Sequence, residues 1–335
     1  MVGDPFSWRP RRVLVGYDGT VGGDDGLALA TAIAEPGAEF LLVDVIPPVG
    51  IFTMRPRRLE DGEPPQSAGF FCEALERMSG RTVETRSYVA NSAARVLSEV
   101  AEEEDYDIVV IGACYPGVVG RVLIGSVGEG LMHGAVVPVV AAPRSYAERP
   151  PKALKQIAVA WDASPEAHEA LAHAQVMARQ TGGEIHLLYV SPPESFAAKV
   201  GDLTRPSPDR VLAEGFAAVA PDIPIDGSSL EGREIASTIS VTCAERGVDL
   251  LVVGSRGYGM LGRVIVGSVA TGLLHGAPCP VLTVPRPHSG EGSDDTDRRT
   301  ASTVTSRWAR RPDACPPTTG VLADRRRRSR LGDRR

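Results

Sequence analysis

The stretch VVIGACYPGVVGRVLIGSVGEGLMHGAVVPVVAAP, residues 109–143, returns as LVVGSRGYGMLGRVIVGSVATGLLHGAPCPVLTVP at residues 251–285. Matching glycines in the two copies lie 142 residues apart, as Gly112 and Gly254 do. Self-similarity at a fixed spacing is the signature of a repeated structural unit. The chain therefore contains two copies of one domain.

The similarity continues upstream of these glycine-rich stretches. RRVLVGYDGT in the first copy matches KQIAVAWDAS in the second, which places Asp18 opposite Asp162. FLLVDVIPP matches IHLLYVSPP in the same way, so that Val45 stands opposite Val190. The spacing grows by only two or three residues, which indicates short loop insertions within one shared fold.

Within each copy, short apolar runs alternate with segments of helical spacing. In the second copy we expect strands at residues 156–161, 184–190, 223–230, 248–254 and 280–284 and helices at 165–181 and 235–246. Strand–helix alternation at this pitch predicts an α/β fold with two tandem doubly wound domains, each a five-stranded parallel sheet of the Rossmann-like type. Segments 46–66 and 191–208 are expected to be mobile loops.

Composition and charge bound the function classes. The 335 residues are 43% hydrophobic and 23% charged, as in a globular protein. An Arg-rich tail, residues 286–335, carries a charge of +6 and is expected to be disordered, which leaves −12 for residues 1–285. An acidic folded part argues against a nucleic-acid surface. The tail could bind nucleic acid or anionic lipid, although we favour a solvated, unstructured extension.

Other partners and locations follow from what the sequence lacks. No apolar run reaches about 18 residues, and the N-terminal stretch has no signal-peptide core, so a cytoplasmic protein without a membrane partner is expected. The five cysteines are scattered without a CxxC pair, and His168 and His173 have no Cys or carboxylate partners at metal-ligand spacing, so no metal site is expected.

A glycine pattern in the second copy is the first candidate for chemistry. Gly254, Gly257, Gly267 and Ser268 form G-x2-G-x9-G-S directly after an apolar strand. Glycines allow the main chain to turn at positive φ and to approach a ligand, and the following helix start attracts phosphate. Two arginines inside the loop could add charge-assisted contacts. A glycine-rich surface turn with a serine cap remains the alternative.

Two further features end neighbouring strands of the expected sheet. Asp162 follows the first strand, where its carboxylate could hold a ribose or Mg²⁺, or else cap the next helix. Val190 ends the second strand, where unpaired backbone groups could read an adenine edge. Taken singly, both have ordinary structural explanations. In a doubly wound sheet, however, all three features converge on the crevice at the topological switch point.

This set resembles the universal stress protein family, whose ATP-binding members carry G-x2-G-x9-G-S/T. The resemblance covers domains at residues 11–144 and 154–285. It implies the adenine nucleotide alpha hydrolase-like form of the fold, ATP with or without Mg²⁺ as ligand, and a role in stress response. It also implies pairing of the two domains through their last strands, and allows homo-oligomers. The implied nucleotide contacts are Asp162, Ala163, Ser164, Val190, Gly254, Arg256, Gly257, Gly259, Arg263, Gly267, Ser268 and Val269 in the second domain and Asp18, Gly19, Thr20, Val45, Gly112, Gly117, Gly125, Ser126 and Val127 in the first.

The first domain departs from the family pattern in its glycine loop. Tyr115 stands where the second domain has Gly257. A tyrosine cannot easily adopt a left-handed conformation, and its side chain blocks close approach. Pro116 stiffens the turn further, while Gly117 or Gly120 could compensate in part. We therefore expect weaker ATP binding in the first domain.

The functional hypothesis is a nucleotide-dependent regulatory binding module without catalytic residues. No Walker A sequence or SGGxDS loop is present, and the glycine loop offers no evident general base. Two alternatives stay open: a slow ATPase or nucleotidyl-transfer enzyme of the same fold, and an interaction scaffold that binds no nucleotide.

Overall fold

The computed structural model describes residues 9–48, 57–59, 68–114, 119–191, 193, 206–255 and 267–285. All of them belong to one compact unit, Met1–His288. The expected tail, residues 286–335, lies outside the described residues.

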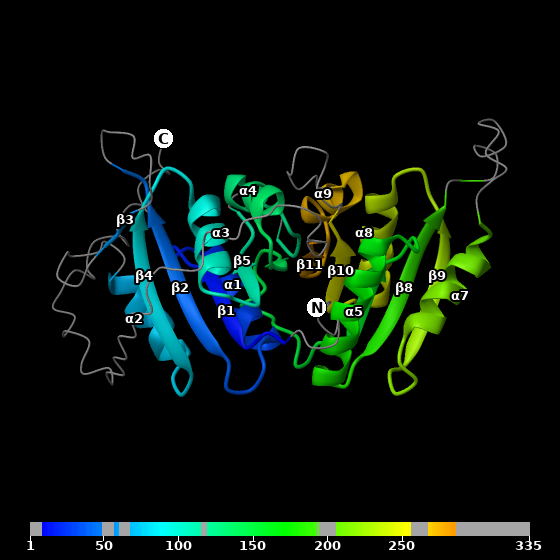
Figure 1. Ribbon diagram of the computed structural model, residues 1–335, viewed down its shortest axis with the longest axis horizontal. Coiled ribbons are helices and arrows are strands. Elements are labelled where there is room, and N and C mark those ends of the chain that lie inside the picture. Colours follow the sequence, from blue (N-terminus) through cyan, green and yellow to red (C-terminus); the bar gives the residue numbers. More distant parts are fainter. Residues whose placement is uncertain are drawn as a thin grey trace, which may run out of the picture. The chain divides into compact units, whose positions relative to one another are not determined.

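Each half alternates strands and helices as expected (Figure 1). The first half contains β1 (Arg12–Gly16), α1 (Val21–Ile33), β2 (Glu39–Ile46), β3 (Arg57–Arg58), α2 (Ala68–Arg77), β4 (Thr82–Val89), α3 (Ala93–Glu103), β5 (Ile108–Ile111), α4 (Ser126–Gly134) and β6 (Val139–Ala141). The second contains β7 (Gln156–Ala160), α5 (Pro165–Thr181), β8 (Glu184–Ser191), α7 (Pro208–Ala218), β9 (Ile225–Glu231), α8 (Ile235–Arg246), β10 (Leu250–Gly254), α9 (Ser268–Leu274) and β11 (Val281–Val284).

The strands form a single sheet in the order β3-β4-β2-β1-β5-β6-β11-β10-β7-β8-β9. Five strands of each half pair in parallel, which confirms the predicted doubly wound α/β class. The last strands of the two halves pair antiparallel, with Leu282 opposite Val140. The two-residue strand β3 adds an antiparallel edge within a segment expected to be a loop.

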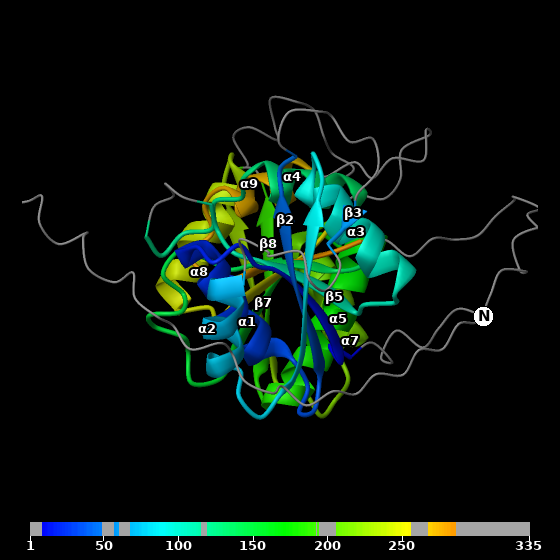
Figure 2. The same cartoon turned by 90° about the vertical axis from the view of Figure 1, so that its left-hand side faces the viewer.

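Helices cover both faces of this sheet. Figure 2 shows α1 and α2 on one side of β2 and α3 on the other. Alternate strand residues pack on opposite faces, so Val13 and Val15 join the cluster under α1, α2, α5 and α7, whereas Leu14 joins the cluster under α3, α4, α8 and α9. Because both faces are covered, strands such as β5 are buried along their whole length and read as continuous apolar runs.

A polar contact fixes the segment that connects the halves. Asp25, on α1, is completely buried, and its carboxylate accepts hydrogen bonds from the backbone N–H groups of Ser145 (2.7 Å) and Ala147 (2.8 Å). Burial raises the pKa of the Asp25 carboxyl above its ordinary value, against the opposing effect of the two N–H donors. The connection therefore starts in a fixed position.

Candidate functional site

Each half has a topological switch point where a ligand crevice is expected. β7 lies between β8 and β10, because the chain proceeds from β7 outward to β8 and β9 and then returns to β10 and β11 on the other side. Residues that follow β7, β8 and β10 therefore meet at one edge of the sheet. Asp162, Val190 and Gly254 occupy those three strand ends. β1, between β2 and β5, gives the first half the same arrangement.

The turn after β7 is built around Asp162. One carboxylate oxygen, Oδ1, accepts a hydrogen bond from the backbone N–H of Ser164 (3.0 Å), while Ser164 itself caps α5 by accepting from Ala167 N (3.2 Å). Ala163, between them, has φ of 59°, a left-handed conformation that costs a non-glycine residue about 1 kcal/mol. Asp162 remains exposed. The serine is thus the helix cap, and the carboxylate shapes the turn while staying accessible.

A cavity of about 510 Å³ opens beside this turn. Asp162 and Ala163 form one wall, and the start of α7 forms the other. The α7 side contributes Pro206, Ser207, Arg210, Val211 and Glu214. The sequence interpretation missed these residues, although Ser207 followed by Pro208 is an ordinary helix-start signal, and Ser207 Oγ does accept from Arg210 N (3.4 Å).

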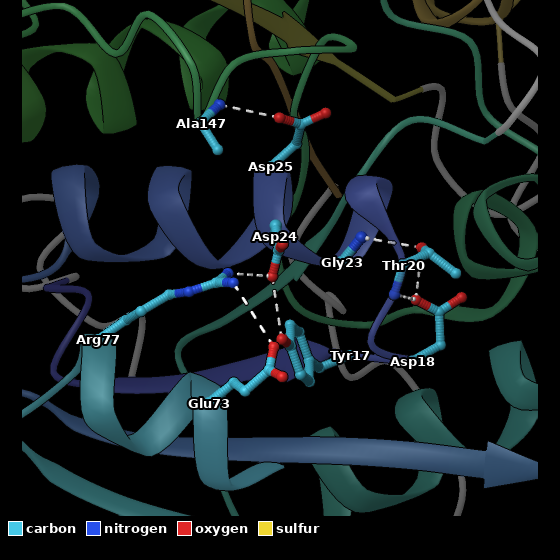
Figure 3. Close-up of polar contacts among 9 residues, drawn as sticks. All are labelled: Tyr17, Asp18, Thr20, Gly23, Asp24, Asp25, Glu73, Arg77 and Ala147. Atoms are coloured by element: carbon cyan, nitrogen blue, oxygen red, sulfur yellow. Dashed lines mark hydrogen bonds and ion pairs between the residues drawn. The ribbon is translucent and has the colours of Figure 1, made fainter. Parts of the chain in front are cut away.

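The first half repeats the turn (Figure 3) and places an aromatic ring beside it. Asp18 Oδ1 accepts from both N (3.1 Å) and Oγ1 (2.6 Å) of Thr20, and Thr20 caps α1 through Gly23 N (3.2 Å). Gly19 has φ of 71°, matching Ala163. A Cβ on Gly19 would lie 2.5 Å from the ring of Phe70, on α2. The aromatic ring therefore covers the turn that the second half leaves open.

An ion-pair cluster holds α2 in that position. Tyr17 Oη donates to Asp24 Oδ1 (2.9 Å), and Arg77 Nη1 lies 2.5 Å from the same oxygen (Figure 3). Burial, followed by the hydrogen bond to Asp24, raises the pKa of Tyr17 far above its ordinary value, so the phenol stays protonated. The ring of Tyr17 also packs edge-on against Phe70, with centroids 5.7 Å apart.

Val190 presents its backbone at the crevice. The carbonyl of Leu188 accepts from Trp161 N (3.0 Å) on the β7 side, and that of Ser191 accepts from Gly232 N (2.9 Å) on the β9 side. Backbone groups alternate direction along a strand, so those of Val190 point toward β7, beyond its last pair with β8. Val45 lies at the same place on β2, beyond the pair of Gly16 with Val43.

The first glycine of each loop has a packing role. A Cβ on Gly254 would lie 2.8 Å from the Cβ of Glu166, and one on Gly112 would run into the carbonyl of Gly22. Neither glycine has a positive φ, and Gly267 has φ of −66°. The interpretation that glycine is needed for a positive-φ turn is therefore wrong at these positions. Glycine is required at Gly112 and Gly254 because the first turn of α1 or α5 packs directly on the strand end.

The helices after the loops begin without a side-chain cap. Gly267 is the N-cap of α9 and Gly125 that of α4, and neither glycine has a side chain that could cap its helix. Ser268 and Ser126 are the first helical residues, and both are exposed. Their amides, with those of Val269 and Val127, form positive helix ends of the kind that bind anions.

One residue at this edge was not predicted. Ser255 directly follows Gly254, is 5% exposed, and its buried Oγ has no hydrogen-bond partner among the residues that the structure describes. The first half has Ala113 at the equivalent place. A buried hydroxyl normally finds a partner, so Ser255 is a polar group at this edge that the sequence interpretation did not consider.

Part of the predicted site falls outside the described residues: Arg256, Gly257, Gly259, Arg263 and Gly117. The first-half counterpart of Arg263 is Arg121, and its guanidinium donates to the carbonyl of Gly276 in the second half (2.7 Å). Backbone bonds from Val122 and Ile124 join the same region. The first glycine loop is thus tied to the last helix of the other half.

A separate polar cluster joins β8, β9 and α8. His186 contacts Ser228 Oγ through Nε2 (3.1 Å) and Asp226 through Nδ1 (3.2 Å), an order also found in hydrolytic triads. Arg246 donates to the same Ser228 oxygen (2.9 Å). Burial, and then Arg246, lower the pKa of His186. Since the cluster lies outside the cavity beside Asp162, we interpret it as a structural network.

The fold and these strand ends define a tandem doubly wound α/β protein with equivalent strand ends at its two switch points. Solved structures share the fold: a universal stress protein from Archaeoglobus fulgidus is 21% identical with a TM-score of 0.55, over 83% of this chain and 99% of that one. A functionally unknown protein from Pseudomonas aeruginosa is 16% identical with a TM-score of 0.58, over 84% of this chain and 94% of that one.

The family follows from sequence. The family model of the universal stress proteins matches twice, at residues 10–143 and 153–285, so the chain belongs to the universal stress protein family as a tandem two-domain member. A universal stress protein from Thermus aquaticus is 30% identical over 137 residues, 39% of this chain and 98% of its own length. One from Mycobacterium tuberculosis is 26% identical over 202 residues, 58% of this chain and 66% of that protein. None of the described helices is long and apolar enough to cross a membrane.

Proposed function

We propose that the second half binds ATP and that the protein is a cytoplasmic, nucleotide-dependent regulatory module of the stress response. The observation that carries the proposal is the open cavity beside the exposed Asp162 at the β7 switch point. Covalent chemistry is not required, since a ligand acts on a protein whenever its affinity differs between two conformations.

The residues at this edge suit the parts of the nucleotide. Backbone groups of Val190 would contact the adenine edge, and the carboxylate of Asp162 would accept hydrogen bonds from ribose hydroxyls. The uncapped start of α9, at Ser268 and Val269, supplies N–H donors for phosphate. Ser255 adds a buried hydroxyl that has no partner within the described part of the chain. The loop from Arg256 to Arg263 would complete the phosphate contacts, with Mg²⁺ on the triphosphate if it binds.

The first half would bind ATP more weakly. Two features support this part of the proposal: Tyr115 replaces the second loop glycine, and Phe70 covers Gly19 where the second half has a cavity. The antiparallel pairing of β6 with β11 would be the interface through which nucleotide in the second half influences the first. Further self-association of the whole chain is compatible with this arrangement.

Isothermal titration with ATP tests the assignment. Asp162→Ala should weaken binding about 10- to 100-fold, the usual effect of losing hydrogen bonds to a charged group. Asp162→Asn keeps an oxygen for the Ser164 N–H and separates loss of charge from loss of the turn. Asp18→Ala is the matched control in the first half and should leave the tight site unchanged. Equal effects of the two alanine variants would contradict the proposal.

The rival functions are separated by two simple measurements. Steady-state phosphate release that disappears in Asp162→Ala and Gly257→Ala would favour a slow ATPase. Purified protein that binds no adenine nucleotide would favour an interaction scaffold. We expect saturable binding without appreciable turnover.

A further inference from the structure

The polar network of β8, β9 and α8 is built around a buried histidine. His186 is 7% exposed and lies near the start of β8, whereas Val190 lies near the end of that strand. Its Nε2 lies 3.1 Å from Ser228 Oγ. Its Nδ1 lies 3.2 Å from Asp226 Oδ2 and 3.4 Å from Arg246 Nη1. The imidazole therefore stands between a carboxylate and a guanidinium group.

Arg246 joins the end of α8 to β9 through this network. It is the last residue of α8, and its Nη2 donates to Ser228 Oγ (2.9 Å). Its Nη1 lies 3.7 Å from Asp226 Oδ2. Ser228 and Asp226 both belong to β9, which stands at the end of the strand order. This guanidinium group thus links the helix end to the last strand.

The network depends on the charge of His186. Among the described residues, the charged groups that act on the ring are Arg246 from α8, Asp226 from β9 and Glu184 from β8 itself. Its neighbour on β7 is Ala158, which carries no charge. A neutral imidazole can accept a hydrogen bond at one nitrogen, whereas an imidazolium donates at both. Protonation therefore turns the contact with Arg246 into a contact between two cations.

The equivalent places in the first half hold groups whose charge stays constant near neutral pH: Leu41, Glu84, Arg86 and Glu104. Arg86, on β4, donates to Glu84 (2.6 Å) and to Glu104 at the end of α3. The link between strand and helix end is thus an ion pair of reversed polarity beside a leucine. Arginine and glutamate keep their charges between about pH 5.5 and 8, whereas histidine does not.

We propose that protonation of His186 is an acid-sensitive switch of the second half, which displaces Arg246 from Ser228 and loosens the contact between α8 and β9. Burial, followed by Arg246, lowers the pKa of His186 below its ordinary value of 6.5. The unfolded chain therefore binds this proton more tightly. The contribution to stability is present above the unfolded value and is lost as pH falls toward the folded-state pKa. The switch goes beyond the proposed ATP function and does not depend on it.

NMR spectroscopy of the full-length chain without added nucleotide tests the electrostatic step. The imidazole C–H resonances give the titration midpoint of His186 directly, and His186→Gln identifies them among the six histidines. Arg246→Gln should raise this midpoint by roughly half a pH unit, because a neighbouring positive charge is removed. Asp226→Asn should lower it. An unchanged midpoint in Arg246→Gln would overturn the proposal.

Hydrogen exchange tests the structural step in the same protein. Protection factors in residues 225–231 and in the last turn of α8 should fall about threefold between about pH 7.5 and 5.5 in wild type. Those of β4 and the last turn of α3 should not change. His186→Leu, which copies Leu41, should keep high protection at both pH values, and Arg246→Gln should show low protection at both.

These variants are needed because burial also lowers the pKa of His173, so the pH dependence of global stability does not isolate His186. Unchanged protection of β9 in wild type would overturn the switch. An equal loss in β4 would do so too, as would a pH-dependent loss in β9 that persists in His186→Leu.

Discussion

The turns after β1 and β7 have the same backbone and different surroundings. Gly19 and Ala163 are both left-handed, and both follow an aspartate whose Oδ1 accepts the N–H two residues on. Phe70 covers the first turn, while a cavity of about 510 Å³ adjoins the second. The two halves therefore share the local geometry of this turn. Its accessibility depends on the helix that packs beside it, α2 in the first half and α7 in the second.

The buried carboxylate of Asp25 should give the largest effect. Asp25→Ala leaves two N–H groups of the connecting segment unpaired, which we expect to lower the free energy of unfolding by roughly 3 kcal/mol. Glu169 occupies the equivalent place in the second half and is only half-buried, so Glu169→Ala should cost less. Urea denaturation measures both. Equal losses of unfolding free energy in the two variants would contradict the expectation that the buried carboxylate stabilises only the first half in this way.

The pH dependence of stability tests the burial of the Asp25 carboxyl in a second way. Because the folded-state pKa of Asp25 lies above its unfolded value of about 3.9, the folded state binds the proton more tightly. Stability should therefore fall as pH rises from about 4 through the folded-state pKa. Asp25→Asn removes this slope, so the difference between wild type and variant should shrink as pH rises toward neutrality. A constant difference would contradict the raised pKa.

The two glycine loops can be exchanged at one position. Gly257→Tyr should lower ATP affinity in the second half about 100-fold, roughly 2.7 kcal/mol. Tyr115→Gly should strengthen binding in the first half only in part, because Phe70 still covers the turn. If titration shows that Tyr115→Gly raises the ATP affinity of the first half to that of the second, the loop alone would account for the difference in affinity between the halves.

The left-handed residues of the two turns, Gly19 and Ala163, can also be exchanged. Gly19→Ala puts a methyl group against the Phe70 ring and should destabilise the fold by about 2 kcal/mol. Ala163→Gly relieves the left-handed backbone strain but raises the conformational entropy of the unfolded chain. The two effects on the free energy of unfolding should cancel to within about 0.5 kcal/mol. Thermal unfolding gives both values. A large loss from Ala163→Gly would contradict the equivalence of the turns.

The smallest expected effect concerns the arginine pair. Arg121→Ala removes the bond to Gly276 and should cost about 1 kcal/mol of stability. Arg263 is proposed as a phosphate contact, so Arg263→Ala should lower ATP affinity in a calorimetric titration and leave stability nearly unchanged. Unchanged ATP affinity together with a loss of stability like that of Arg121→Ala would contradict this role.

Features with local signals were predictable from sequence. Strands such as β7 and β8 and the helix α5 are marked by apolar periodicity, and the repeat places Asp18 and Asp162 at equivalent strand ends. The doubly wound topology follows from that alternation, and it brings the ends of β7, β8 and β10 together.

The remaining features depend on packing between distant segments. Nothing in the sequence near Gly19 indicates that Phe70 lies over it. The local sequence around Gly254 indicates only a loop glycine, whereas the structure requires glycine there because α5 approaches closely at Glu166, 88 residues upstream. Helix α7, by contrast, had a Ser-Pro start signal that could have been recognised.

The antiparallel join between β6 and β11 has a consequence for how the molecule behaves at low abundance. An association between separate subunits is lost on dilution, whereas two modules on one chain meet at an effective concentration fixed by their linker. Communication across this join should therefore be the same in a cell holding few copies and in one holding many.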